Sequence, residues 1–152
     1  MDDQVFNVFK AFCDSFHESV ASMTGLSIKR LKAGSSLPVE APFFTVITGF
    51  KGEKSGSVLL KSSAAAILRL YTRYLGEESD SINPDVIDGV KELASIVNGA
   101  ASAKEQQLKL SFTPSMTLYS EIVENHVSSK AVGAATSYFV EECGVFTIEI
   151  HQ

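Results

Sequence analysis

The chain has 152 residues, of which 45% are hydrophobic, and this length and composition are typical of one domain with a core of its own. Its formal net charge of −5 at pH 7 offers no basic field to phosphate backbones or anionic lipid, so neither nucleic acid nor a membrane surface is an expected partner. The acidic N-terminus, and the lack of an apolar run near the roughly 18 residues of a membrane span, predict a cytoplasmic protein.

The first predicted element is a helix that ends at Gly25, a plausible C-cap. Its apolar residues recur at spacings of three and four, namely Phe6, Phe9, Cys13, Phe16, Val20 and Met23. Short runs rich in β-branched and aromatic residues then predict strands within 26–34, 41–50 and 55–62. A second helix is predicted over 63–75, and it stops at Gly76.

A third, longer helix is predicted to begin at Asn83-Pro84, an N-cap followed by proline at the first helical position, and to end at about Gln106. Three more alternating runs predict strands within 108–121, 131–142 and 144–152. The last of these strands, GVFTIEI, carries only Glu149 as a charge and is predicted to be an edge strand through which two copies pair as a homodimer.

The order of elements suggests one unit of a helix, three strands and a helix used twice. The segments 18–25 and 92–99 support this weakly, because each places a Glu and a Gly seven residues apart. No linker-like segment divides the chain. We therefore expect a single α+β domain over residues 1–152, with both halves sharing one sheet and one core.

The long helix contains a glycine, Gly99, although a glycine inside a helix costs roughly 1 kcal/mol relative to alanine. At about 100° per residue the apolar side consists of Val86, Val90, Leu93, Val97 and Ala101. The polar side consists of Asp85, Asp88, Glu92, Ser95, Gly99 and Ser102. Gly99 either lets a partner approach the polar side closely or is simply tolerated on a solvated face.

The segment ELASIVNGAASA, residues 92–103, resembles the signature helix of the CheC/CheX family of bacterial chemotaxis phosphatases. The segments FHESVASMTGL, ITGFKGEKSGSVLL, LGEES and INPDVIDGVKEL extend the resemblance over most of the chain, and a single good copy of the motif places it closest to CheX. The resemblance implies an antiparallel six-stranded sheet packed with long helices, often dimeric through sheet edges. It also implies dephosphorylation of a phosphorylated CheY-like receiver domain.

The resemblance further implies what individual residues do. Glu92 would pair with a lysine of the receiver, and Gly99 would let the receiver backbone press against the helix. Asp88 and Asn98 are included as candidate partner contacts, although Asn98 lies about 120° around the helix from Glu92. The chain is expected to need no cofactor of its own, because the divalent ion (Mg) of the reaction belongs to the receiver.

The chain departs from the family motif at Ser95, where the family has the Asn that orients water for in-line attack. A serine hydroxyl can hydrogen-bond water, but it is one bond shorter than an amide oxygen. Two hypotheses therefore remain open: a phosphatase that uses Glu92 and Ser95, and a module that binds phosphorylated receivers without much hydrolysis.

Other candidate chemistry is not supported by the spacing of the residues. Cys13 and Cys143 are far apart and outside any CxxC pattern, which predicts free thiols. His17, His126 and His151 are scattered without companion ligands, so no metal site is predicted.

Overall fold

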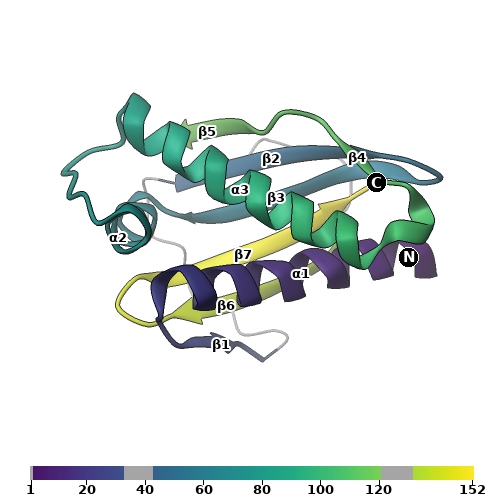
Figure 1. Cartoon of the computed structure of the whole chain (residues 1–152), viewed down its shortest axis with the longest axis horizontal. Helices are drawn as coiled ribbons and strands as arrows, with labels where there is room; N and C mark the ends of the chain where they lie inside the picture. Colours follow the sequence, from purple (N-terminus) through teal and green to yellow (C-terminus); the bar gives the residue numbers. More distant parts are fainter. Residues whose placement is uncertain (1, 33–42, 121–131) are drawn as a thin grey trace.

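The computed structural model describes residues 2–32, 43–120 and 132–152. Three helices, α1 (Asp3–Thr24), α2 (Ala64–Leu75) and α3 (Pro84–Lys104), lie on one face of an antiparallel sheet (Figure 1). The two long helices, α1 and α3, contact each other along this face, and α2 lies beside the N-terminal part of α3. In the described part of the chain, no helix has the length and apolar character that a membrane crossing requires.

The sheet has the strand order β1-β6-β7-β3-β2, and both β4 and β5 pair with the outer side of β2. The strands are β1 (Ile28–Arg30), β2 (Phe43–Lys51), β3 (Ser55–Ser63), β4 (Ser111–Phe112), β5 (Met116–Ser120), β6 (Val132–Val140) and β7 (Gly144–His151). A duplicated unit would match β1 with β4 and β5, β2 with β6, and β3 with β7. With these strands matched, the strand order is the same when it is read from either side of the sheet. The duplication itself stays a prediction.

Local capping signals fix where the helices begin and end. The Asp2 side chain accepts a hydrogen bond from the Gln4 backbone N–H at 2.8 Å to start α1, and Gly25 ends that helix in the left-handed conformation with φ 70°. The Asn83 side chain accepts from the Val86 N–H at 3.0 Å to start α3. These boundaries confirm the predicted ones, except that α3 ends at Lys104 rather than near Gln106.

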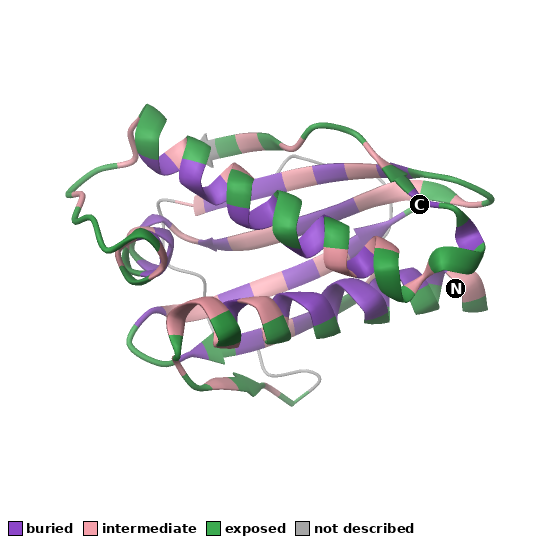
Figure 2. Ribbon diagram, in the orientation of Figure 1, coloured by how far each residue is buried: buried purple, intermediate pink, exposed green. Residues whose placement is uncertain are grey.

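The core lies between the helices and the sheet, and Figure 2 shows the buried positions on the sides of α1 and α3 that face the strands. Large side chains with almost no exposed surface come from both halves of the chain: Phe16, Phe44, Ile67, Leu70, Phe146 and Ile150. The two halves therefore share one core, as expected. Both cysteines are free thiols, and both are buried.

The sheet has seven strands instead of the predicted six, because the run 108–121 is divided. Pro114 has no backbone N–H to donate to a ladder, and it falls between β4 and β5. Side chains bridge the gap: the Gly49 N–H donates to Thr113 Oγ1 at 3.0 Å, and Ser115 Oγ lies 2.9 Å from Thr48 Oγ1. The two short strands thus occupy the place of one.

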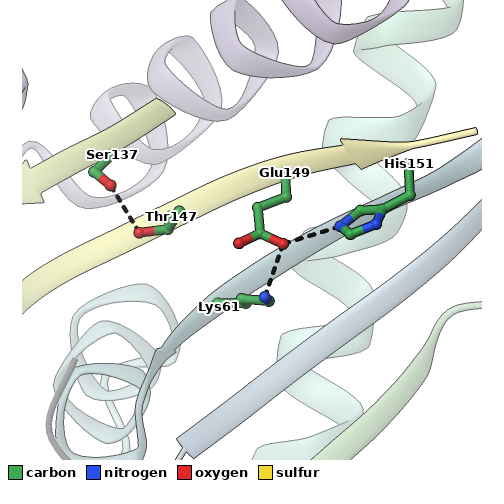
Figure 3. A network of polar contacts seen from close by, with 5 residues as sticks. All are labelled: Lys61, Ser137, Thr147, Glu149 and His151. Carbon is green, nitrogen blue, oxygen red and sulfur yellow. Dashed lines mark hydrogen bonds and ion pairs between the residues drawn. The ribbon is translucent and has the colours of Figure 1, made fainter. Parts of the chain in front are cut away.

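The prediction that GVFTIEI forms an edge strand is wrong, because β7 lies in the middle of the sheet between β6 and β3. Its outward-facing Glu149 is paired within the sheet, with Lys61 Nζ at 2.7 Å and His151 Nε2 at 3.0 Å (Figure 3). In the described part of the chain, the outer strands are β1 on one side and β4 with β5 on the other.

Candidate functional site

The long helix α3 packs one side against the core and leaves the other exposed (Figure 2). Its buried side consists of Val86, Gly89, Val90, Leu93, Ala94, Val97, Asn98 and Ala101. We use the name α3 stripe for Asp88, Glu92, Ser95 and Gly99, all of which are exposed. The helical periodicity of the sequence therefore identified this surface correctly, and Glu92 and Ser95 share it one turn apart.

Gly99 is not required by any contact inside the described part of the molecule. A Cβ atom built at this position meets no described atom within 4 Å, and the residue is exposed. The fold would accept alanine here, and alanine is the better helix former. The position is consistent with both interpretations drawn from the sequence, a surface cleared for a partner and a solvated face.

Gly89, one turn before Glu92, is required by packing. A Cβ atom at Gly89 would lie 2.8 Å from Cε2 of Tyr71 and 3.1 Å from Cδ1 of Leu75. The absence of a side chain thus lets α2 pack closely against α3. A glycine on the apolar side of an amphipathic helix is the sequence signal for such a close approach.

Asn98 does not belong to the α3 stripe. It is 8% exposed and lies in the wall of a small cavity between α1, α3 and the sheet. This cavity measures about 30 Å³ and is lined mainly by apolar side chains such as Phe16, Leu60 and Leu93, whereas small-molecule sites usually measure about 300–1,000 Å³. Asn98 is therefore not part of the exposed contact surface, and the cavity is too small for a small-molecule ligand.

Tyr74 of α2 reaches the α3 stripe from outside the motif. Burial raises the pKa of its phenol, and the negative charge of the Glu92 carboxylate raises that pKa further. The ring is partly buried and packs against the core. No sequence motif pointed to Tyr74, because the contact depends on how two separate helices cross.

Comparison with known proteins identifies the family of this chain. The family model described as "Chemotaxis phosphatase CheX" matches residues 44–136, which include most of β2, all of β3, α2, α3, β4 and β5, and part of β6. The chain belongs to the CheX family. The match covers Glu92, Ser95 and Gly99, so the α3 stripe lies inside the matched part of the chain.

Solved structures show that the rest of the chain follows the CheX fold. CheX from Vibrio vulnificus is 19% identical with a TM-score of 0.76, over 93% of this chain and 93% of that one. A CheC-like protein from Shewanella oneidensis is 19% identical with a TM-score of 0.77, over 95% and 97% of the two chains. A comparison with curated protein sequences gave no significant match.

A third solved structure is a complex of CheX with CheY, BeF3 and Mg2+ from Borrelia burgdorferi. The matched chain is 18% identical to this protein with a TM-score of 0.72, over 93% of this chain and 95% of that one. Together these matches confirm the expected CheC/CheX resemblance and a mixed fold of three helices on an antiparallel sheet.

Proposed function

We propose that this protein is a phosphatase that hydrolyses the aspartyl phosphate of a CheY-like receiver domain. The observation that carries the proposal is the α3 stripe: Glu92, Ser95 and Gly99 are all exposed on one side of the helix, inside the segment that matches the CheX model. The CheX–CheY complex from Borrelia burgdorferi supports a receiver domain as the partner.

Glu92 would anchor the receiver. Among the described residues, no ion pair occupies its carboxylate, so it can accept an ammonium group from a partner. Gly99 lies two turns further along the same side, about 10 Å away at 1.5 Å per residue. With no side chain at that point, the receiver backbone can approach the helix while Glu92 holds the receiver's lysine.

Ser95 would orient the attacking water from its place one turn after Glu92. In this step the water oxygen forms a bond to phosphorus and the bond between phosphorus and the aspartyl oxygen breaks. The products are the receiver's free aspartate and inorganic phosphate, and the water gives up its protons to the phosphate and the solvent. The divalent ion that neutralises the phosphoryl charge would belong to the receiver, and we propose no cofactor for this chain.

The alternative function is a module that binds phosphorylated receivers without hydrolysing them. The short side chain of Ser95 favours it, because a hydroxyl on Cβ reaches less far from the helix than the amide of an asparagine. The same stripe would then recognise the receiver, with Glu92 and Gly99 in the same roles.

The decay rate of a phosphorylated CheY receiver, measured with and without this protein in the presence of Mg2+, separates the two functions. Faster decay that increases with protein concentration supports the phosphatase. Unchanged decay, together with tighter binding of the phosphorylated than of the unphosphorylated receiver, establishes the binding module. If the protein neither speeds decay nor binds the receiver, both functions are wrong.

We further propose that the protein forms a homodimer through an outer strand of the sheet. The strand β5 exposes Met116 and Leu118, at 60% and 42%, beside an unpaired edge in the described sheet. An exposed edge with apolar side chains is prone to pair with a second copy.

A further inference from the structure

The exposed side of α3 carries one large apolar side chain, that of Ile96. This residue is 40% exposed, whereas Leu93 and Val97 of the same helix are buried. Isoleucine is also a weaker helix former than alanine or leucine, because its β-branched side chain is restricted in a helix. Helix propensity therefore does not account for an isoleucine at this exposed position.

Ile96 lies beside the proposed anchor for the receiver. It follows Glu92 by four residues and precedes Gly99 by three, so it is about one turn from each of them. At about 100° per residue, Ile96 lies about 40° to one side of Glu92, and Ser95 lies about 60° to the other side. A partner that meets Glu92, Ser95 and Gly99 therefore also meets Ile96.

Small residues surround Ile96 on the exposed side of the helix. We use the name α3 apolar row for Ile96, Ala100 and Ala103, which share one side of α3 at spacings of four and three. Ala103 is exposed, and Ala100 is half-buried. A Cβ atom at the neighbouring Gly99 would meet no described atom within 4 Å. The isoleucine thus stands above small neighbours, on a surface that is open to a partner.

The helix α2 covers the same side of α3 at Gly89, seven residues before Ile96. A Cβ atom at Gly89 would lie 2.8 Å from Cε2 of Tyr71 and 3.1 Å from Cδ1 of Leu75. Figure 1 shows α2 beside the N-terminal part of α3 only. Ile96 lies about 10 Å further along the helix and about 20° around it from Gly89, beyond this contact. The side of α3 that is covered at Gly89 is therefore exposed at Ile96.

We propose that Ile96 is an apolar anchor for the receiver, which packs against an apolar part of the receiver surface next to the lysine that Glu92 meets. The inference rests on the proposed function, because the receiver is the partner, and it holds for the phosphatase and for the binding module. Less than half of Ile96 is left to bury, so its burial should contribute about three- to tenfold in affinity.

The first measurement is calorimetric titration with a CheY receiver activated by beryllofluoride and Mg2+. Ile96→Ala should weaken binding about three- to tenfold. Ile96→Leu keeps the apolar volume and should bind nearly as well as the wild type. Circular dichroism of each variant checks that the fold is retained.

Phe139→Ala is the matched control, because it also removes an exposed apolar side chain. Phe139 is 44% exposed, close to the 40% of Ile96. It lies on β6 and faces away from the helices, since the next residue along the strand, Tyr138, packs against Phe16 of α1. Its replacement should leave receiver binding unchanged.

The second measurement separates an apolar contact from an effect on the neighbouring carboxylate. The titrations are repeated at about 1 M salt, where charges are screened beyond about 3 Å. The loss caused by Glu92→Ala should shrink there, whereas the loss caused by Ile96→Ala should persist, because apolar burial does not depend on charge. In a Glu92→Ala background, Ile96→Ala should weaken binding by the same factor as in the wild type.

The outcomes distinguish this inference from the proposed function. If Glu92→Ala weakens binding and Ile96→Ala does not, the apolar anchor is wrong and the proposed function stands. If the loss caused by Ile96→Ala disappears at high salt or in the Glu92→Ala background, the isoleucine acts through the carboxylate, and the inference is also wrong. The same holds if Phe139→Ala causes an equal loss. If the wild-type protein does not bind the activated receiver, the proposed function fails and the apolar anchor fails with it.

Discussion

Lys104 at the end of α3 forms an ion pair with Glu18 of α1, with 2.7 Å between Nζ and Oε2. In the sequence match between the two halves of the chain, Glu18 corresponds to Glu92 and Gly25 to Gly99. The first glutamate is thus paired within the molecule, and Gly25 ends its helix instead of lying within it. Of the two segments, only that of α3 combines an exposed glutamate with a helix that continues past the glycine.

The first prediction concerns the anchor. Glu92→Ala and Glu92→Lys should change the free energy of unfolding by no more than about 0.5 kcal/mol, because the side chain is exposed. Both should weaken binding of an activated receiver by about tenfold or more, with Glu92→Lys the more severe because it places a positive charge against the receiver's lysine. Calorimetric titration measures the affinity, and Asp14→Ala, which removes an exposed acid from α1, is the control. Unaltered affinity in both Glu92 variants would mean that the α3 stripe is not the docking surface.

The second prediction concerns the two glycines of α3. Gly99→Ala should raise the free energy of unfolding by up to about 1 kcal/mol, because alanine favours the helix and its methyl group meets no described atom within 4 Å. It should also weaken receiver binding, because the methyl group stands where the partner's backbone would approach. Urea unfolding and receiver titration measure the two effects.

Gly89→Ala is the matched control for that experiment. The same substitution in the same helix should lower the free energy of unfolding by about 1–3 kcal/mol, since the new methyl group would lie 2.8 Å from the Tyr71 ring. Greater stability without loss of binding in Gly99→Ala would show that Gly99 lies on a merely solvated face.

The boundaries of the helices could be predicted from the sequence, because the signals are local. Gly25, Gly76 and Asn83 lie next to the segments that they cap. The position of β7 in the sheet could not be predicted, because pairing between distant strands has no local signal in the sequence. When one face of an antiparallel sheet is buried, a central strand shows the same alternation of apolar and polar residues as an edge strand. Glu149 on β7 suggested an exposed edge, whereas its charge is balanced by Lys61 on the neighbouring strand β3.

The candidate site was likewise predictable from the sequence only in part. Glu92, Ser95 and Gly99 were placed on one exposed side by helical periodicity alone. Asn98, about 120° around the helix from Glu92, was predicted as a partner contact, but it is buried in the structure. The influence of Glu92 on the pKa of Tyr74 could not be predicted from the sequence, because the two residues lie on different helices.

The third prediction is a dependence of stability on pH that comes from Cys13. Burial raises the pKa of this thiol to about 11, from 9.0 for an unperturbed thiol. Between these values the unfolded chain loses a proton that the folded protein keeps, so the free energy of unfolding should fall as the pH rises, by up to about 3 kcal/mol. Well below pH 9 the thiol is protonated in both states, and stability should not depend on it there.

Urea unfolding on both sides of this pH range measures the effect, with Cys13→Ala as the comparison. Other buried groups, including Tyr138, also have raised pKa values, so the wild type and the variant should both lose stability. The wild type should lose more. Equal losses in the two proteins would contradict the assignment of the effect to Cys13.

The fourth prediction concerns assembly through β5. The protein should be a dimer by light scattering at tens of micromolar, and Leu118→Lys should convert it to a monomer by placing a charge at the pairing edge. Phe139→Lys is the control, because Phe139 is similarly exposed, at 44% against 42% for Leu118, but lies on β6, which has strands on both sides. A monomeric wild type excludes the dimer, and a Leu118→Lys variant that remains dimeric moves the interface away from β5.

The last prediction concerns Ser95, the position at which the chain departs from the family motif. Ser95→Asn extends the polar group further from the helix, so it should speed dephosphorylation of the receiver if the surrounding geometry suits an amide. Ser95→Ala removes the hydroxyl and should lower the rate to that of the receiver alone, while binding stays nearly unchanged. The substitutions should have little effect on stability, because the residue is exposed.

Single-turnover decay of the phosphorylated receiver, with protein in excess of the measured Kd, separates the hydrolytic step from binding. If Ser95→Asn slows hydrolysis while Ser95→Ala abolishes it, serine is the adapted water-positioning group, and its shorter reach is no handicap in this protein. If neither variant changes a rate that already equals the receiver's own decay, and Gly99→Ala still weakens binding, the protein is a binding module for phosphorylated receivers. A phosphatase without the family's asparagine requires that Ser95→Ala lose turnover while keeping affinity, because only a group that acts on the water, and not on the receiver surface, produces that combination.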